Sequence, residues 1–429
     1  MPLSLFRTPS YKRRGAACLS VAVAMALAGT AAQSASAEAP AGASGTTYYV
    51  DAVNGHDGNA GTSAAAAWRS LGKVNAFAFR PGDTVSFRRG QSWTGRLVVS
   101  RSGTATSPLS VTAHGDGARP VIGGGAVECV LLIGSYVRVS GLRATGCAWA
   151  GFEIRGDHNL LDSVRADKNV AGVVITEGAS FNTVRAGELV DNNEMSVNDP
   201  GGENDSGAFG ILLNGDDNTI TGNTITGSFA TSYDYGYDGA AIEVYNGDRN
   251  RIEYNTTRDN LVFTELGHDE GATADGNTYA YNVVTSVRDA GAFLVTRGAG
   301  VGTGPVRGTT AVNNSVHLPG ERSDGWVCYA GCAPGVLKLR NNIVSVGGTV
   351  GYEDGEGADE DNSVYWGPDV RFDPGPASVT ADPLFTGEGD LRLQPGSPAL
   401  GRGVPVGYTR DIAGAAVPAT APDAGAYQH

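Results

Sequence analysis

The chain has 429 residues, a formal net charge of −14 and a pI of about 4.9, which argues against nonspecific nucleic-acid binding. Hydrophobic residues make up 41% and charged residues only 18%, so the chain is not a disordered polyelectrolyte and has enough apolar side chains for a large core. The 63 glycines follow no strict three-residue period, which excludes collagen.

The first 37 residues have the features of a secretory signal peptide. A basic stretch ends at Arg14, residues 15–32 are small and apolar, and an Ala-x-Ala cleavage site follows at 35–37. We therefore expect a signal peptide at 1–37, a linker at 38–45 and a secreted mature domain at 46–429 without membrane association. An uncleaved membrane anchor is the alternative.

Four cysteines remain after the predicted cleavage, and four cysteines allow three pairings. Nearest-neighbour pairing, Cys129–Cys147 and Cys328–Cys332, closes two short loops and suits an oxidising compartment. A zinc site is disfavoured because no histidine flanks either pair at ligand spacing.

The middle of the chain repeats. Coils of roughly 20–25 residues carry paired asparagines separated by short β-branched runs, as in a parallel solenoid. The two predicted ladders comprise Asn159, Asn182, Asn218, Asn250 and Asn277, and then Asn223, Asn255, Asn282, Asn314 and Asn342. We expect these asparagines to turn the corners in left-handed backbone conformation and to hydrogen-bond along the stack.

The two end segments carry a family resemblance. TTYYVDAVNGHDGNAG in segment 46–125 and ADPLFTGEGDLRLQPGSPALGRG in segment 376–429 resemble blocks of secreted pectin-lyase-like β-helix proteins, including family-nine polysaccharide lyases. The resemblance implies an all-β, right-handed parallel β-helix as one domain, with coils over 126–375. A short helical stretch near 64–77 is expected to cap it.

Strand alternation within the coils predicts a column of outward side chains. Aligning the coils on the first ladder places six residues in this column: Glu153, Val174, Leu212, Glu243, Glu265 and Leu294. Glu243 and Glu265 would then lie about 4.8 Å apart on adjacent coils. Stacked like charges are destabilising, so the pair needs a shared proton, a cation or a functional role, unless it is a solvated acidic surface.

Insertions flank the strands of this pair. Residues 191–206 and 228–237 precede the strands, whereas residues 268–276 and 296–308 follow them. Long loops on a solenoid usually build its binding face, so the insertions predict a cleft between two walls.

Further candidates belong to this predicted cleft. Asp238, Asn260 and Asp289 should form a second column, which adds Asp238 and Asp289 to the two glutamates as candidate catalytic residues. Candidate substrate-binding residues are Tyr235, Tyr237, Tyr245, His268 and Arg297, where tyrosine rings stack on sugar faces. Ordinary strand and loop packing is the alternative for these side chains.

Three functions fit this pattern. The favoured one is a secreted, monomeric glycoside hydrolase that acts on a polysaccharide or oligosaccharide with paired carboxylates and no cofactor. The second is a calcium-dependent polysaccharide lyase, as the family resemblance implies. The third is a non-catalytic glycan-binding or surface β-helix protein. The sequence has no G-x-S-x-G, H-E-x-x-H or P-loop motif.

The lyase alternative depends on an acidic loop. YDYGYDG (233–239) is similar to the family's calcium motif, and the calcium ligands would be Asp234, Asp238, Glu243 and Glu265. In that family a lysine abstracts the substrate proton. Here no lysine follows the loop until Lys338, and Lys168 is the lysine on a nearby coil, so the hydrolase is favoured.

Overall fold

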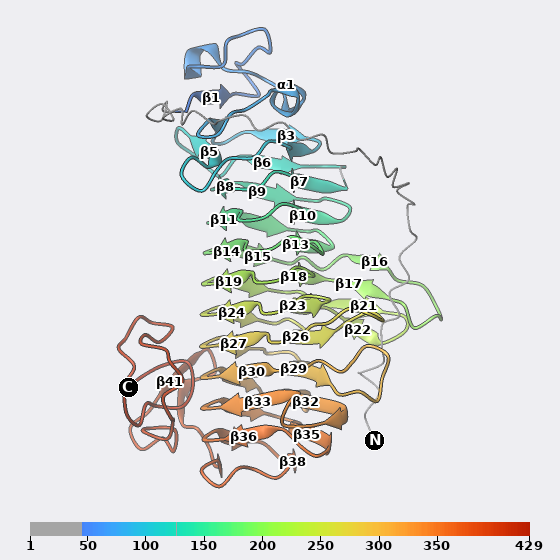
Figure 1. Cartoon of the computed structure of the whole chain (residues 1–429), viewed down its shortest axis with the longest axis vertical. Coiled ribbons are helices and arrows are strands. Elements are labelled where there is room, and N and C mark those ends of the chain that lie inside the picture. The colour runs from blue at the N-terminus through green and yellow to red at the C-terminus, as the bar shows by residue number, and fades with distance from the viewer. Residues whose placement is uncertain (1–44, 126) are drawn as a thin grey trace, which may run out of the picture.

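The computed structural model describes residues 45–125 and 127–429, so the predicted signal peptide and the linker up to residue 44 lie outside it. Short coils stack into a tall column whose regular structure is almost entirely β (Figure 1). Each coil contributes one strand to each of three parallel sheets. The predicted right-handed parallel β-helix is confirmed.

The first sheet has twelve strands in the described residues. In stacking order they are β1 (Thr47–Val50), β2 (Thr84–Arg88), β5 (Leu109–His114), β8 (Val137–Ser140), β11 (Leu160–Asp162), β14 (Thr183–Arg185), β19 (Thr219–Thr221), β24 (Arg251–Glu253), β27 (Thr278–Ala280), β30 (Thr309–Val312), β33 (Leu337–Arg340) and β36 (Asp359–Asp361).

The second sheet also has twelve strands in the described residues. They are β3 (Ser92–Thr94), β6 (Val121–Gly123), β9 (Arg143–Thr145), β12 (Arg165–Asp167), β15 (Glu188–Val190), β20 (Thr224–Thr226), β25 (Thr256–Arg258), β28 (Val283–Thr285), β31 (Ser315–Leu318), β34 (Ile343–Val346), β37 (Val364–Trp366) and β39 (Val379–Thr380).

The third sheet has eleven strands in the described residues and carries the candidate site. They are β4 (Leu97–Val99), β7 (Glu128–Leu132), β10 (Ala150–Ile154), β13 (Ala171–Ile175), β18 (Phe209–Leu213), β23 (Ala240–Tyr245), β26 (Val262–Gly267), β29 (Ala290–Arg297), β32 (Arg322–Cys332), β35 (Thr349–Gly355) and β38 (Asp369–Arg371).

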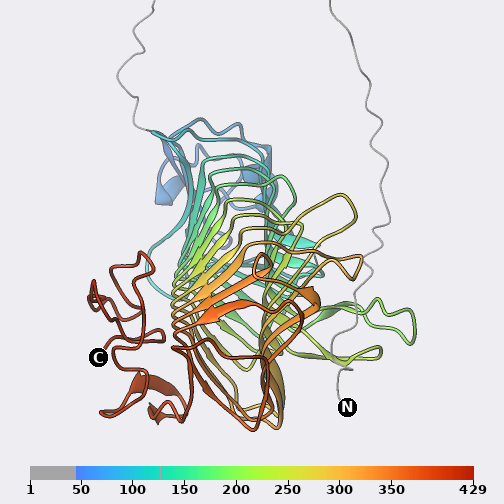
Figure 2. The same cartoon turned by 60° about the horizontal axis from the view of Figure 1, so that its bottom comes forward.

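Three antiparallel hairpins lie outside these sheets. They are β16 (Met195–Val197) with β17 (Ser206–Gly207), β21 (Ala230–Ser232) with β22 (Gly236–Asp238), and β40 (Phe385–Gly387) with β41 (Asp390–Leu393). Figures 1 and 2 show the first two hairpins on one side of the column and the C-terminal segment on the other.

Asparagine ladders hold the corners between sheets. In the first ladder, Asn250 Oδ1 accepts from the Asn218 backbone N–H at 2.8 Å, and Asn250 Nδ2 donates to Asn277 Oδ1 at 3.0 Å. The expected left-handed conformation of these asparagines is wrong, because the preceding residue adopts it, as at Asp217 (φ 55°) and Arg249 (φ 54°). The preceding residue turns the corner, which leaves the asparagine amide free to bond along the stack.

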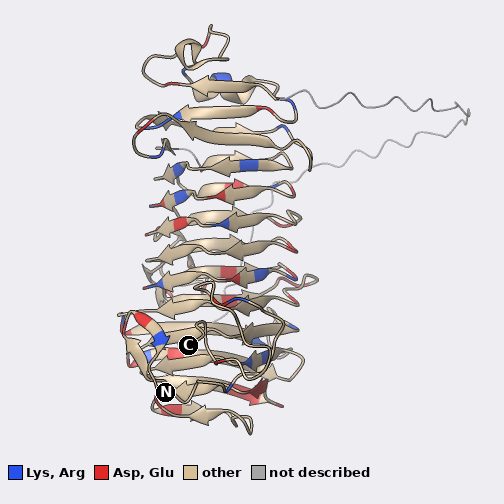
Figure 3. Ribbon diagram, turned by 90° about the vertical axis from the view of Figure 1, so that its left-hand side faces the viewer, with Lys and Arg blue, Asp and Glu red and all other residues tan. Residues whose placement is uncertain are grey.

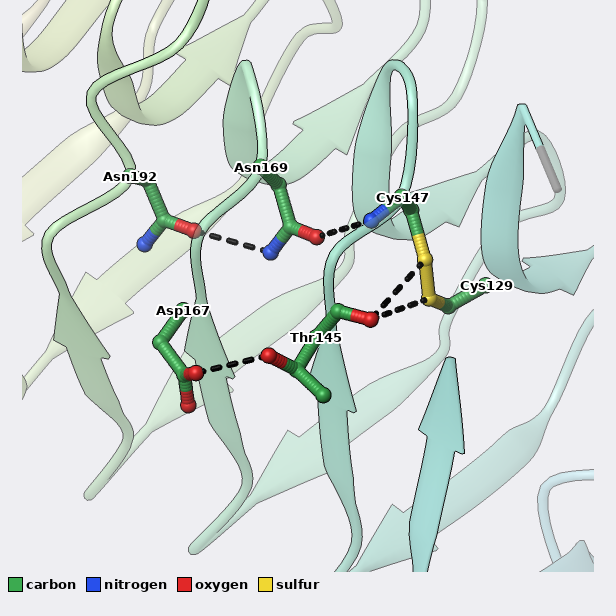
Figure 4. Close-up of a disulfide and its surroundings, with 6 residues drawn as sticks. All are labelled: Cys129, Thr145, Cys147, Asp167, Asn169 and Asn192. Atoms are coloured by element: carbon green, nitrogen blue, oxygen red, sulfur yellow. Dashed lines mark hydrogen bonds between the residues drawn. A yellow bond between two sulfur atoms is a disulfide. The ribbon is translucent and has the colours of Figure 1, made fainter. Parts of the chain in front are cut away.

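Both predicted disulfides are present, Cys129–Cys147 and Cys328–Cys332. Figure 4 shows the first one beside a third asparagine ladder that the sequence interpretation missed. There, Asn169 Oδ1 accepts from the Cys147 backbone N–H at 2.9 Å, and Asn169 Nδ2 donates to Asn192 Oδ1 at 2.9 Å.

A helical segment covers the N-terminal end of the column, and the C-terminal segment covers part of its side. A 3₁₀ turn, η1 (Ala64–Ala66), and a short helix, α1 (Leu71–Ala76), lie at the N-terminal end, where Leu71 and Val74 are buried, so the predicted capping helix is confirmed. The C-terminal segment docks along the coil corners, where the Tyr408 hydroxyl contacts Glu253 Oε1 at 2.5 Å. Among the described residues, no helix is long and apolar enough to cross a bilayer.

Candidate active site

The two predicted glutamates lie opposite each other on the outer face of the third sheet. Glu243 on β23 pairs in register with Glu265 on β26, and Glu243 pairs with Leu212 on β18. Neighbouring positions such as Ile242 and Leu266 point inward and are fully buried. Directly opposed residues on parallel strands are separated by about 4.8 Å.

The predicted column of outward side chains differs from the structure at β29. Glu265 pairs with Val295, whereas Leu294 pairs with inward-facing Thr264 and is fully buried in the core. The predicted outward position of Leu294 is therefore wrong by one residue. The strand's apolar sequence, Ala-Gly-Ala-Phe-Leu-Val, lacks the alternation that would fix its register, and Phe293 stacks on Phe263 inside the column at 5.6 Å.

A cleft of about 1110 Å³, including its open mouth, lies over the glutamate pair. Its wall before the strands comes from the hairpin regions and contains Asp205, Ser206, Tyr235, Tyr237 and Asp238. Its wall after the strands contains Asn214, Tyr245, Asn246 and Asp269. Three of the four predicted insertions thus line the cleft, while the described lining includes no residue of 296–308.

Glu243 forms no ion pair in the described part of the chain, although the nearby charge of Arg297 favours its ionised form. Within residues 45–125 and 127–429, its carboxyl group forms no direct hydrogen bond or ion pair, while Glu265 and Asp238 lie near it. Burial first, and then the charges of these two residues, raise the pKa of Glu243 well above its usual value. Glu243 therefore retains its proton at a pH at which a solvated glutamate is ionised.

Glu265 has a cationic partner. Arg297 Nη2 donates to Glu265 Oε1 in an ion pair, and the arginine side chain is only 1% exposed. Arg297 Nη1 also donates to Thr303 Oγ1 at 3.1 Å, and the guanidinium lies 5.3 Å from the Tyr329 ring centre. Arg297 is thus a buried support for Glu265 rather than the substrate contact that the sequence suggested.

Asp238 is the third carboxyl group of the cleft. Burial, followed by the charges of Glu265 and Asp205, raises the pKa of Asp238 from its usual 3.8 to about 7, against a 2.8 Å hydrogen bond from the Gly239 backbone N–H. Asp205 is itself buried and accepts from Ser232 Oγ at 2.7 Å. The cleft therefore combines a paired carboxylate with two carboxyl groups that favour their protonated forms.

The three predicted tyrosines line the cleft. Tyr237 packs on Phe229 with 4.8 Å between ring centres, and burial first raises the pKa of Tyr235 to about 12. The Tyr245 hydroxyl donates to Asp269 Oδ1 at 3.0 Å, and Asn246 Nδ2 donates to Asp269 Oδ2 at 3.0 Å. The sequence interpretation missed Asp205, Asn214, Asn246 and Asp269; the one available signal for Asp269 was its place in a predicted insertion.

Besides the buried Arg297, two further predicted site residues lie outside the cleft lining. Asp289 is 62% exposed and pairs with Arg322 at 2.8 Å, because it precedes β29, whose register differs from the predicted one. His268 is buried, and its ring nitrogens contact the carbonyl oxygens of Asp269 at 2.8 Å and Pro305 at 3.2 Å. His268 therefore supports the loop after β26 and does not face the cleft.

The four predicted calcium ligands do not come together. Asp234 accepts hydrogen bonds from the backbone N–H groups of Gly201 and Asn204, both at 2.9 Å, and does not line the cleft. The residues described in the structure contain no group of three or more His, Cys, Asp or Glu arranged to hold a metal ion. Lys168 is exposed at the corner before β13 and is not part of the lining.

Comparison with known proteins gives carbohydrate-active relatives. No family model matches the sequence. The chain is 41% identical over 122 residues to a lacto-N-biosidase of Bifidobacterium longum subsp. longum, which covers 26% of this chain and 8% of that protein.

Solved structures extend the likeness to most of the chain. Pectate lyase Pel9A has a TM-score of 0.64 at 18% identity and covers 90% of this chain and 97% of its own. The GH136 lacto-N-biosidase from Eubacterium ramulus has a TM-score of 0.57 at 17% identity, covering 76% and 65%. The chain thus spans less than two thirds of both lacto-N-biosidases. With its three parallel sheets, the chain has a right-handed parallel β-helix fold similar to that of pectate lyase Pel9A.

Proposed function

We propose that the protein is a glycoside hydrolase that cleaves glycosidic bonds in the cleft over Glu243 and Glu265. The observation that carries this proposal is the asymmetry of the pair. Two glutamates face each other in register, and among the described residues only Glu265 forms an ion pair with a cation. One carboxyl group that keeps its proton beside one that is ionised is the requirement for acid-assisted glycoside cleavage.

The separation of the pair favours retention of anomeric configuration. Strand spacing places the two backbones about 4.8 Å apart, and carboxyl groups at a similar separation match the roughly 5–5.5 Å of retaining glycosidases rather than the roughly 6.5–9.5 Å of inverting ones. Glu243 protonates the leaving oxygen while Glu265 attacks the anomeric carbon, so the glycosidic bond breaks as a glycosyl ester forms. Glu243, now ionised, then takes a proton from water, whose oxygen displaces Glu265 and regenerates both groups.

The surrounding residues support these roles. Arg297 pairs with Glu265 and fixes the orientation of its carboxyl group for attack. Asp238 raises the pKa of Glu243 and thereby helps it to hold the proton that it donates. Tyr235 and Tyr237 offer aromatic surface to a sugar ring, while Tyr245 and Asn246 lie on the opposite wall.

The relatives support a role in glycan cleavage. The lacto-N-biosidase match is local, and pectate lyase Pel9A shares the fold at 18% identity, so neither supplies the substrate or the reaction class. The placement of Asp234 and the absence of a lysine among the described lining residues favour hydrolysis over the lyase reaction.

The test is a glycan screen with the mature wild-type protein and three isosteric variants. Glu243→Gln and Glu265→Gln should each lower turnover by about 100-fold or more, the usual range for loss of a catalytic acid or nucleophile. Glu388→Gln is the matched control, because Glu388 is exposed in the β40–β41 hairpin on the opposite side of the column. Full turnover by both site variants, or calcium-restorable formation of unsaturated sugars, would overturn the proposal.

A further inference from the structure

Every Asp, Glu, Lys or Arg side chain in the described cleft lining is a carboxylic acid, whether ionised or protonated. These residues are Asp205, Asp238, Glu243, Glu265 and Asp269, and the lining contains no lysine or arginine. Arg297 compensates Glu265 from behind, but it is 1% exposed, and its Nη atoms already donate to Glu265 and Thr303. Arg322 lies 6.0 Å from the Tyr237 ring centre, but it is not part of the lining and is already paired with Asp289. Within the lining, an incoming ligand therefore meets carboxyl groups and no cation.

The hydrogen-bond donors to the outer carboxylates are neutral and leave their negative charge in place. Asp205 accepts from the Ser232 hydroxyl and the Asp234 backbone N–H, and these bonds lower its pKa although burial opposes them. Asp269 accepts from the Tyr245 hydroxyl and the Asn246 side chain. Both carboxylates thus lack a cationic partner among the described residues.

In other parts of the molecule, acidic residues have cationic partners. Upstream on the same sheet, Glu128 pairs with Arg96 at 2.7 Å and Glu153 pairs with Arg155 at 2.6 Å. On the side that carries the C-terminal segment, basic and acidic residues are interspersed along the coils (Figure 3). The cleft therefore differs from these two regions, in which the acidic residues have basic neighbours.

We infer that the cleft selects uncharged glycans and rejects uronate-containing or sulfated ones, an inference that rests on the proposed function. Sugar hydroxyl groups are donors, and the carboxyl, amide and phenol oxygens of the lining are acceptors for them. A carboxylate or sulfate on the ligand would instead be brought close to like charges without a compensating cation. Such like-charge contact at an interface costs several kcal/mol.

A binding experiment with charge-matched probes tests this inference. Glu243→Gln mimics the protonated form of Glu243, so it stops acid catalysis and leaves the charge of the cleft unchanged. The probes are neutral hexose oligosaccharides and the same oligosaccharides oxidised at C6 to uronates. Calorimetry measures the affinity of the Glu243→Gln variant for each probe. For each oligosaccharide that binds, we expect the dissociation constant of the neutral form to be at least about tenfold lower than that of the oxidised form at about 0.05 M salt. This difference in affinity should shrink at about 0.5 M salt.

Two further variants show whether the cleft charge is responsible. Asp269→Asn removes one charge from the cleft lining and should reduce the difference in affinity between neutral and oxidised probes. Thermal melting checks that this variant is folded. Asp116→Asn removes the same charge from an exposed turn near the N-terminal end and should leave this difference in affinity unchanged.

The outcomes separate this inference from the proposed function. Equal or tighter binding of the uronates would overturn the inference, and the glycosidase proposal would stand if neutral and uronate glycans were both hydrolysed. Binding of no glycan at all would overturn both. If Asp269→Asn and Asp116→Asn showed the same difference in affinity between neutral and oxidised probes, the charge of the cleft would not be the cause of the preference for neutral glycans.

Discussion

Glu243 and Glu265 face each other in register across β23 and β26, yet Arg297 pairs with Glu265 alone. Two residues of the same type therefore have different electrostatic surroundings about one strand spacing apart. Burial, followed by the charges of Glu265 and Asp238, raises the pKa of Glu243 although the Arg297 charge opposes this, whereas Glu265 is held in an ion pair.

The first prediction concerns the stability of the two glutamine variants. Glu265→Gln removes the carboxylate partner of a buried arginine and should destabilise the fold by about 3 kcal/mol, as expected when a buried ion pair loses one member. Glu243→Gln removes a half-buried carboxyl group that forms no ion pair in the described residues, so it should leave the stability at neutral pH unchanged or raise it. Denaturant unfolding of both variants measures this difference, and equal destabilisation would contradict the asymmetry.

The second prediction concerns pH and stability. The pKa of Asp238 is raised from 3.8 to about 7, so between these pH values the folded protein holds a proton that the unfolded chain has released. Asp238 therefore lowers the free energy of unfolding as pH rises from about 3.8 to about 7. Above about pH 7 its contribution stays constant. Asp238→Asn should therefore gain stability relative to wild type as pH rises from about 4 to about 8. A constant difference across this range would contradict the raised pKa.

The third prediction concerns pH and activity. Turnover should follow a bell-shaped profile whose alkaline limb reports proton loss from Glu243. The charge of Asp238 contributes to the raised pKa of Glu243, so Asp238→Asn should move the alkaline limb to lower pH and retain turnover in acid. Initial rates across pH give the answer. Complete loss of turnover at every pH in a folded Asp238→Asn variant would instead identify Asp238 as the acid.

The fourth prediction concerns the asparagine ladder. Asn250→Ala removes the acceptor of the buried Asn218 N–H and the donor to Asn277 Oδ1, so it should destabilise the fold by about 2 kcal/mol or more. Asn193→Ala is the matched control, because Asn193 is exposed and should change stability by less than about 0.5 kcal/mol. Thermal melting of both variants checks this, and similar melting temperatures would show that the ladder bond is dispensable.

The coil architecture and the glutamate pair could be predicted because both depend on local regularities. Repeated asparagines mark the coil corners, and strand alternation around Ile242 and Val244 fixes which face Glu243 occupies. The uniformly apolar run in β29 has no such alternation, which is why Leu294 and Asp289 were misplaced by the same shift.

The remainder of the site depends on contacts between distant segments. Asp205 enters the cleft because its hairpin region packs beside the β21–β22 hairpin, where Ser232 bonds to it. Arg297 was predicted near the site, but only its burial beneath Glu265 distinguishes an ion-pair partner from a substrate contact. His268 was placed wrongly because a loop histidine can equally bond to the backbone of its own loop.

The proposal that the protein hydrolyses glycans is tested most directly with a glycan that the protein cleaves. This glycan is digested in water enriched in a heavy oxygen isotope, and the products are analysed by mass spectrometry. Hydrolysis over Glu243 and Glu265 should place one solvent oxygen at each new reducing end, with both glutamine variants releasing almost no product. Products that carry an unsaturated sugar and no solvent oxygen would contradict hydrolysis and identify elimination instead.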